Sequence, residues 1–550
     1  MFDAFSSYSG MLLIIIFSAV FGFIYQFVLR SWFYFSDRNV KFVRGMPLLG
    51  STFKSVIGLE PSAISFRRLY EYFPKEKFIG IYDFGGRPSY LIRDPDLIKQ
   101  LIVTDCDHFI SNKLAIKNEN DYFSQTLFGM CGSLFGKWSG MEYTTNLLFS
   151  TNKMPMMHEL MVKITEQFIE TLKRTDKIAK IFDSRDLFTR YTNDIIAKTA
   201  FDVEMNSLNG IDNEFYNAGS ALNECRYVDG LKFLASLNFP SIIKTLDVFG
   251  AKEKHISTLR KFLGKTIEAR TNKKSDRNNL IDLLIQARNG KLECNNSDDK
   301  IDIGFATTVE LTTSKPKDEI QECTDDDIAL QCVAFYLSTL SSVSQIACFM
   351  FHELALNPDI QDKLYAEINS VKNDLNGSSI TYEIIPKMKY LDMVLCETLR
   401  RWCPIPFLER TCISPYVLET NGEKCIELQI DNGIFIPTYG LQMDEKYFPK
   451  PMKFNPERFS EENKGSIQTG TYLPFGIGTR NSIGSRFMII TIKTLVFHLL
   501  SEFYVDKSYK TPDPLKLKAL PLLMDAEKGF FIELRRRNPD RTPYESQVFT

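Results

Sequence analysis

The stretch from Thr324 to Leu356 constrains the fold more than any other feature of this sequence. It contains neither Gly nor Pro, and Pro358 follows it. Thr324 is a preferred N-cap residue, and the aspartates at 325–327 put negative charge at the positive end of a helix dipole. The pattern predicts one helix of roughly 50 Å. Because helices average about 11–12 residues, we expect this one to form the spine of a large α-rich fold.

The first thirty residues contain an apolar run long enough to cross a membrane. Residues 11–29 carry no charge, and only Ser18, Tyr25 and Gln26 interrupt them with polar groups. As a helix the run spans about 28 Å, close to the roughly 30 Å of hydrocarbon in a bilayer. Basic residues follow it, whereas the only charge before it is Asp3. This distribution predicts that the rest of the chain lies in the cytosol.

The sequence thus predicts a single-pass protein with a lumenal N-terminus at 1–10, a transmembrane anchor at 11–30 and a linker at 31–45. One domain at 46–540 and a tail at 541–550 would follow. A cleaved signal peptide is the alternative interpretation. Against it, the run is long, no small-residue cleavage site follows, and no basic segment precedes it.

Charge and composition give no support for a polyanionic partner. Lys and Arg number 66 against 68 Asp and Glu, a net charge of −2, so we expect no nucleic-acid partner. The 44 Phe suit a large apolar core or a lipophilic pocket. The 11 Cys form no CxxC pair, which indicates reduced cytosolic thiols. The 5 His show no metal-ligand spacing, so we expect them to be surface or core residues.

Outside the long helix, the chain reads as a mainly α protein with a small β-rich subdomain. Residues 41–90 mix turns with β-type runs, and residues 95–290 repeat apolar positions at helical spacing. Residues 290–323 are polar and irregular, which is typical of a surface loop. Strand-like segments return at 416–440 and 510–536.

Three motifs follow the long helix in order. Residues 397–400 read Glu-Thr-Leu-Arg, residues 454–459 read Phe-Asn-Pro-Glu-Arg-Phe, and residues 475–484 read Phe-Gly-Ile-Gly-Thr-Arg-Asn-Ser-Ile-Gly. An ExxR pair alone is common on helices, but the three together resemble the ExxR, PERF and haem-binding motifs of the cytochrome P-450 superfamily. The resemblance extends from residue 11 to about 536, and segments such as EKYFPKPMKFNPERF look most like insect microsomal members.

The resemblance implies the cytochrome P-450 fold, a haem b cofactor and a role for each motif residue. Glu397, Arg400 and Arg458 would form a structural triad beneath the haem. Glycines allow close backbone approach and positive φ, and the arginine fork suits haem propionates. The implied cofactor-binding positions are Phe475, Gly476, Gly478, Arg480, Ser482, Gly484, Trp138 and Arg410.

The haem-binding motif departs from the family at the residue that binds the iron. Ser482 stands where the family has a cysteine, whose thiolate favours O–O cleavage. A thiol has a pKa of about 8.5 and a hydroxyl one closer to that of water, about 15.7. Presenting an anion to the iron would therefore cost roughly 10 kcal/mol more. No cysteine follows Cys425, so we expect Ser482 to be a weaker and electronically different axial ligand.

Two further haem-proximal positions are altered. The family has an acid and an alcohol in the oxygen-activating stretch of the long helix, and this chain has Ser341 and Ser342. Losing a positioned proton donor typically costs about 10²–10⁴ in rate, although simple helix packing is the alternative interpretation. After Trp138, Glu142 replaces the arginine of a WxxxR motif and reverses a charge interaction of roughly 4 kcal/mol. A surface carboxylate is the alternative for Glu142.

Three hypotheses of function follow. The first is a microsomal monooxygenase of the endoplasmic reticulum membrane that oxidises lipophilic small molecules with O2 and electrons from an NADPH-cytochrome reductase. The second is a pseudoenzyme that keeps a lipophile- or haem-binding pocket without catalysis. The third is a rearranging or peroxide-using relative, which would still need the thiolate. Three changes at the haem favour impaired or lost activity, with haem binding possible but weakened, and the sequence names no substrate.

Overall fold

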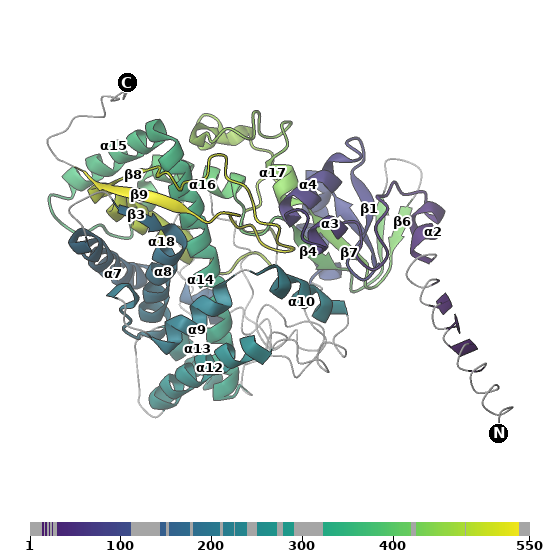
Figure 1. The fold of residues 1–550 in the computed structure, drawn as a ribbon, viewed down its shortest axis with the longest axis horizontal. Helices are drawn as coiled ribbons and strands as arrows, with labels where there is room; N and C mark the ends of the chain where they lie inside the picture. Colours follow the sequence, from purple (N-terminus) through teal and green to yellow (C-terminus); the bar gives the residue numbers. More distant parts are fainter. Residues whose placement is uncertain are drawn as a thin grey trace.

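The long helix predicted from the sequence is the centre of the fold. In the computed structural model it is α14, Asp325–Leu356, so both predicted ends are confirmed. Thr324 Oγ1 accepts a hydrogen bond from the Asp327 N–H (3.1 Å), and the Asp327 carboxylate accepts one from the Thr324 N–H (2.9 Å). This reciprocal cap satisfies backbone donors that a helix start leaves unpaired. Figure 1 shows α14 crossing the helical part of the molecule, where most of its side chains are buried.

Several predicted segments lie outside the part of the chain that the structure describes. The described residues are 30–111, 144–149, 153–175, 180–209, 213–224, 226–238, 250–271, 279–290, 323–419, 425–478, 480–537 and a few residues of 11–25. Segments 1–10 and 541–550, about half of the predicted anchor and nearly all of the loop at 290–323 are therefore not covered. Among the described helices, only α14 is long and apolar enough to cross a membrane, and 72% of its apolar window is buried inside the protein, as in a core helix.

Helices that precede α14 in the chain and helices that follow it pack around it. Its neighbours include α8, α12, α16 and α18, and their apolar side chains merge with those of α14 into one buried cluster. Phe349 of α14, for example, stacks on Trp402 with ring centroids 4.6 Å apart. The helices of this part are α7 Met154–Thr175, α8 Ser184–Phe201, α9 Glu214–Asn223, α10 Tyr227–Asn238, α12 Gly250–Thr271, α13 Leu280–Arg288, α15 Pro358–Asp374, α16 Lys389–Arg401 and α18 Ser485–Glu502.

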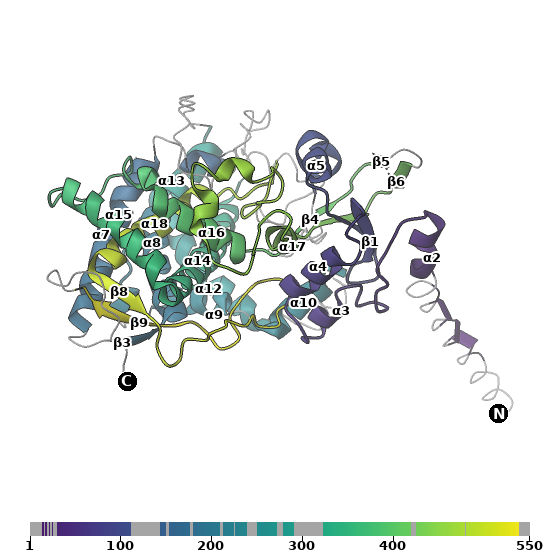
Figure 2. The same cartoon turned by 90° about the horizontal axis from the view of Figure 1, so that it is seen from above.

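The strands form small sheets at opposite ends of the molecule (Figures 1 and 2). One sheet has the order β1-β2-β7-β4, with β2 and β7 parallel, and the other has the order β3-β9-β8. Strands β5 and β6 pair as a hairpin. The strands are β1 Phe78–Tyr82, β2 Pro88–Ile92, β3 Lys180–Asp183, β4 Leu408–Thr411, β5 Tyr416–Glu419, β6 Cys425–Leu428, β7 Gly433–Ile436, β8 Phe503–Asp506 and β9 Phe531–Arg536. The predicted class, mainly α with a small β-rich part, is confirmed.

Short helices lie in both parts of the molecule, and the predicted linker at 31–45 packs against the β-rich end. Helix α2 (Arg30–Asp37) presents Phe35, which is fully buried among the aromatic side chains of β1 and β2. Tyr34 Oη donates a hydrogen bond to Asn432 Oδ1 (3.0 Å). The other short helices are α3 Phe53–Val56, α4 Ser62–Glu71, α5 Pro95–Lys99, α17 Thr438–Gln442, the π-helix η2 Gln100–Thr104 and the 3₁₀-helices η3 Cys106–His108, η5 Ser207–Asn209, η6 Ile385–Lys387, η7 Pro456–Phe459 and η8 Lys464–Ser466.

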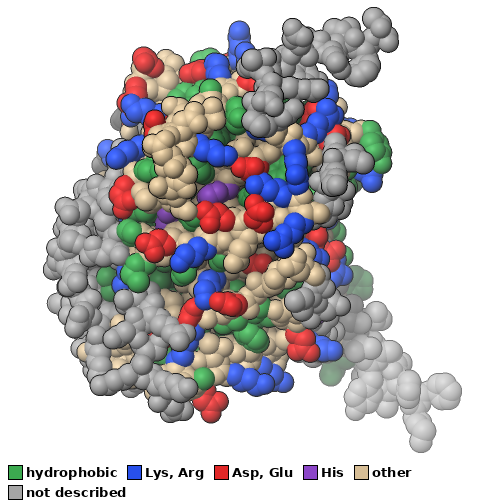
Figure 3. Space-filling model, turned by 90° about the vertical axis from the view of Figure 1, so that its left-hand side faces the viewer, with side chains coloured by type: hydrophobic (Ala, Val, Ile, Leu, Met, Phe, Trp, Pro, Cys, Tyr) green, Lys and Arg blue, Asp and Glu red, His purple; other side chains and the backbone are tan. Residues whose placement is uncertain are grey.

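The end of the molecule that carries α7, α15 and the β3-β9-β8 sheet displays charges of both signs. Figure 3 shows Lys and Arg side chains interspersed with Asp and Glu on this face. Several of them pair across elements, as where Glu502 bonds Lys173 (3.0 Å) and Lys372 (2.9 Å). Exposed pairs of this kind stabilise a fold by less than about 1 kcal/mol each, so the fold depends on its buried contacts.

Candidate functional site

The structure brings together the three charged residues of the ExxR and PERF motifs. Glu397 and Arg400 lie one turn apart on α16, and both side chains are fully buried. Arg400 Nε donates to Glu397 Oε2 (2.7 Å) and Nη2 donates to Oε1 (2.9 Å). Arg458, from η7, places its Nε 3.4 Å from Glu397 Oε1. One buried carboxylate thus lies between two guanidinium groups, and the bidentate pair fixes its orientation.

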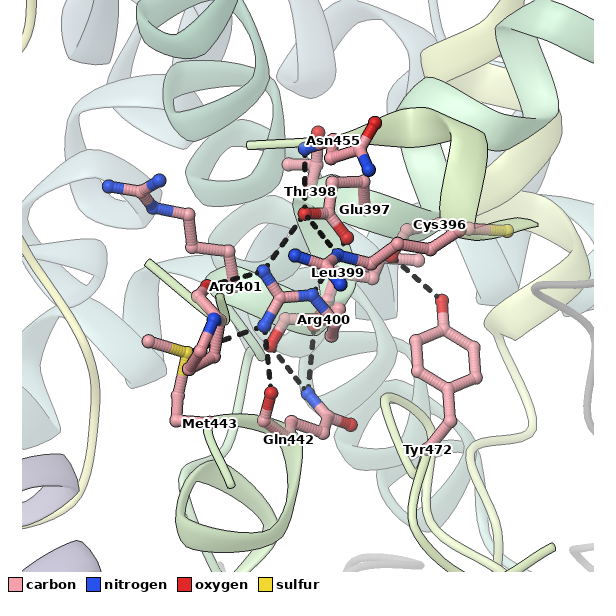
Figure 4. A network of polar contacts seen from close by, with 12 residues as sticks. Cys396, Glu397, Thr398, Leu399, Arg400, Arg401, Gln442, Met443, Asn455 and Tyr472 are labelled. Atoms are coloured by element: carbon pink, nitrogen blue, oxygen red, sulfur yellow. Dashed lines mark hydrogen bonds and ion pairs between the residues drawn. The ribbon is translucent and has the colours of Figure 1, made fainter. Parts of the chain in front are cut away.

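Backbone groups satisfy what remains of this buried network (Figure 4). Arg400 Nη1 donates to the carbonyl of Gln442 (2.8 Å), and Nη2 donates to that of Pro451 (2.7 Å). The Asn455 N–H donates to Glu397 Oε1 (2.9 Å). Because buried charges are costly without partners, these contacts tie α16 firmly to α17 and to the segment that precedes η7.

The loop at 475–484 begins with a buried phenylalanine and two glycines in the left-handed region. Phe475 is buried, and Gly476 and Gly478 have φ of 80° and 82°. A Cβ on Gly478 would lie 2.2 Å from the Ile102 carbonyl oxygen, so no larger residue fits there. The Ser482 N–H donates to the Phe475 carbonyl (2.9 Å) and closes the loop. The glycines therefore set the path that delivers residue 482 to its position.

Ser482 lies where the loop meets helix α18. Gly484 is the N-cap of this helix, which starts at Ser485, and the Ser485 N–H donates to the Ser482 carbonyl (3.4 Å). Ser482 is exposed. A helix start favours an anion by about 0.3–1 kcal/mol, which is small beside the roughly 10 kcal/mol that separates a hydroxyl from a thiol. The helix dipole therefore does not convert Ser482 into an anionic ligand.

Two arginines meet beside the loop. Arg410, on β4, is buried and donates from Nη2 to the Arg480 carbonyl (3.2 Å). Burial and the charge of Arg480 lower the pKa of Arg410 to about 10, although Glu409 opposes this. The Glu409 carboxylate instead bonds Arg87 (3.1 Å), and among the described residues no carboxylate forms an ion pair with Arg410. A buried cation beside a second cation favours an anionic ligand at this point.

These features fit a haem group in all respects but one. The positive-φ glycines provide a backbone that a flat ligand can approach, and Arg410 and Arg480 provide cations for two propionates. The hydroxyl of Ser482 does not fit the thiolate ligand of the family. The chain therefore combines a cradle that suits haem with an axial position that does not suit thiolate chemistry.

Between its two ends, α14 keeps accessible surface on one face only. The partly exposed positions recur at helical spacing and are Ala334, Leu337, Ser338, Ser341 and Ser342. Ser342 Oγ lies 3.4 Å from the Thr339 carbonyl, to which it donates. The predicted pair Ser341 and Ser342 thus lies on the partly exposed face of the middle of this helix, and neither residue carries an acidic group.

Some predicted site residues cannot be placed, and some partners of the site arginines were not predicted. Trp138 and Glu142 lie outside the described residues. Sequence reasoning missed Gln442 and the carbonyls of residues 450 and 451, which receive hydrogen bonds from the buried arginines. Every residue has a carbonyl, so the sequence carries no signal for the last two. For Gln442 the signal was a polar residue between two apolar ones.

Known proteins resemble this chain over most of its length. Residues 45–533 match the family model described as cytochrome P-450. Probable cytochrome P-450 9f2 of Drosophila melanogaster is 34% identical over 86% of this chain and 88% of its own. Cytochrome P-450 9e2 of Blattella germanica is 34% identical over 92% and 94%, and cytochrome P-450 6k1 of the same insect is 31% identical over 90% and 91%. With the motifs, the cradle and the fold in agreement, this chain belongs to the cytochrome P-450 family.

Proposed function

We propose that this chain is a haem-binding cytochrome P-450 whose monooxygenase activity is impaired or lost. The observation that carries the proposal is Ser482, which stands at the start of α18 where the family has its axial cysteine. Haem held by a thiolate supplies the oxidation of lipophilic compounds by O2. A hydroxyl at position 482 removes the ligand on which that chemistry depends.

The residues around Ser482 have separate roles in this proposal. Arg410 and Arg480 would hold the propionates, a role that the family motif also gives to Trp138, and Phe475, Gly476, Gly478 and Gly484 would shape the loop. Glu397, Arg400 and Arg458 hold the scaffold beneath it. Ser341 and Ser342 face the ligand without an acid to relay protons. Haem would bind more weakly, because a bond between the iron and a thiolate no longer contributes to its affinity.

An active monooxygenase is the second candidate, because cytochrome P-450 family members are typically haem monooxygenases. The fully paired Glu397–Arg400 network and the Arg410–Arg480 pair favour it. In that case the chain takes electrons from an NADPH-cytochrome reductase and oxidises a lipophilic small molecule. Both candidates share a location in the endoplasmic reticulum membrane, with an anchor at 11–30 and a catalytic domain at 46–540 on the cytosolic side.

The absorption spectrum of the reduced, carbon monoxide-bound protein tests the proposal. We expect the wild-type protein to bind haem without the long-wavelength thiolate band, and the Ser482→Cys variant to gain that band. Ser485→Cys is the matched control, because it adds a thiol three residues away on a buried position at the start of α18. It should leave the spectrum unchanged.

Each other outcome decides a different point. A thiolate band in the wild-type protein would mean that another cysteine binds the iron, and the proposal would be wrong. Absence of haem from both the wild-type protein and Ser482→Cys would mean that other changes, such as Glu142, have removed the site. NADPH consumption coupled to substrate oxidation by the wild-type protein would establish the second candidate.

A further inference from the structure

The side chain of Gln442 joins three backbone segments inside the core. It is the last residue of α17 and is fully buried. Its Nε2 donates to the carbonyls of Leu399 (3.2 Å) and Arg400 (2.8 Å), and its Oε1 accepts from the Leu473 N–H (2.8 Å). Two carbonyls on one side and an N–H on the other admit only one orientation of the amide.

The two carbonyls lie in the last turn of α16, the helix that carries the ExxR motif. The final carbonyls of a helix have no partner within it. Here the Trp402 N–H reaches the Thr398 carbonyl (2.8 Å), and Gln442 supplies donors for those of Leu399 and Arg400. Gln442 is therefore a side-chain cap for the C-terminus of α16, as Figure 4 shows.

The third bond leads into the loop that contains residue 482. Leu473 stands two residues before Phe475, whose carbonyl accepts the Ser482 N–H. A second tether reaches the same place from α16, because Tyr472 Oη donates to the Cys396 carbonyl (3.1 Å). The entry to the loop is thus bonded to the ExxR helix directly and through Gln442, whereas its exit continues into α18.

We propose that Gln442 is a positioning residue that fixes the position of the 475–484 loop relative to the C-terminal end of α16. It acts through Leu473 and touches no ligand itself. The expected effect on haem retention rests on the proposed function, whereas the expected effect on the loop does not. Losing the Gln442 amide should release the entry of the loop and displace the residue at 482, even though the Glu397–Arg400 pair stays formed.

The chain offers a matched control in Gln361 of α15. This glutamine is also fully buried, donates from Nε2 to the carbonyls of Leu354 (3.1 Å) and Val505 (2.7 Å), and accepts from the Val505 N–H (2.9 Å). Its bonds link α14 to β8 and do not involve the loop. Gln361 Oε1 also accepts a longer bond from Arg537 (3.5 Å). Gln442→Met and Gln361→Met therefore remove closely matched sets of hydrogen bonds from two different places.

Amide hydrogen exchange of the full-length protein, with and without haem, tests the inference. We expect exchange at 473–484 to be at least tenfold faster in Gln442→Met than in Gln361→Met when both have lost similar stability. Haem transfer to an apo-globin acceptor should be faster by a similar factor. Gln442→His should restore both rates in part, because a neutral imidazole offers an acceptor for Leu473 but one donor for the two α16 carbonyls.

Equal exchange at 473–484 in the two methionine variants would overturn the inference, since Gln442 would then be an ordinary core residue. Failure of the wild-type protein to bind haem would contradict the proposed function instead, while the exchange rates would still decide the role of Gln442. If Gln442→Met does not fold, Gln442→Asn gives the test, because its shorter side chain stays neutral but cannot reach both α16 and Leu473.

Discussion

The ion-pair network on α16 and the loop at 475–484 are close in the fold but have kept the family pattern to different degrees. In the network, Glu397, Arg400 and Arg458 are all present and paired. In the loop, the glycines and Arg480 are present, but position 482 is Ser where the family motif has Cys. The difference follows from what each residue does for the fold. Loss of a network residue leaves a buried charge without its partner, whereas Ser in place of Cys is a change of one atom that leaves no charge buried.

The largest effect is expected at the network. Glu397→Ala should lower the free energy of unfolding by about 3–5 kcal/mol, because it leaves the buried Arg400 guanidinium without its carboxylate. Denaturant unfolding of the detergent-solubilised protein measures this. Glu457→Ala is the control within the same PERF motif, since Glu457 is partly exposed and pairs with Lys363 at 3.2 Å. It should cost less than about 1 kcal/mol. Similar losses for the two variants would remove the distinction between the network and its surroundings.

A smaller effect is expected within the loop, and it should differ between glycines. Gly478→Ala should destabilise the protein by roughly 2–3 kcal/mol, because it combines positive φ with a Cβ that meets Ile102. Gly476→Ala should cost about 1–2 kcal/mol from its φ alone, since no atom lies within 3.4 Å of its added Cβ. Gly484→Ala, with φ of −86° and open space, should be nearly neutral. Thermal unfolding gives the order, and the reverse order would show that the loop takes another path.

The smallest effect at neutral pH concerns the helical core, because this effect grows only as the pH falls below 6.5. Burial lowers the pKa of His158 to about 4, with Glu383 opposing the shift, so the side chain is neutral in the folded state. The unfolded chain takes up a proton near pH 6.5. The contribution of His158 is therefore complete above pH 6.5 and is lost as the pH falls toward 4, by about 1.4 kcal/mol for each pH unit.

The variant His158→Phe should flatten the decline in stability between pH 6.5 and pH 4.5 relative to the wild-type protein. Chemical denaturation at several pH values measures the two slopes. His255→Phe is the control, because His255 lies on a partly exposed position of α12. Parallel slopes for the wild-type protein and His158→Phe would mean that the core admits the charged imidazole.

The fold could be predicted where its determinants are local in sequence. Thr324 and Asp327 cap α14 across three residues, and Pro358 follows its end, so the sequence alone gives its bounds. The packing of 31–45 was not predicted, because Phe35 reads equally as a membrane-interface aromatic and as a core residue. Which of these applies depends on β1 and β2, far along the chain.

The candidate site shows the same division. Motif order predicts that Glu397 and Arg458 meet, and in the structure Arg458 Nε lies 3.4 Å from Glu397 Oε1. The backbone partners of the arginines could not be foreseen, because a carbonyl is useful only once the chain path places it. Lys450, with φ of 53°, turns its carbonyl toward Arg458 in a way that no side-chain pattern encodes.

The parallel pairing of β2 with β7 also affects how the protein is synthesised. Ser89 lies opposite Gly433, and the neighbouring contact between Pro88 and Asn432 spans 344 residues. At about 5–20 residues per second, a ribosome needs roughly 20 to 70 s to deliver the missing strand. During that time the apolar edge formed by Tyr90 and Leu91 has no neighbour, which makes it a template for wrong pairing. Strands β1 and β2, which are synthesised first, are therefore where we expect the nascent chain to need protection by chaperones.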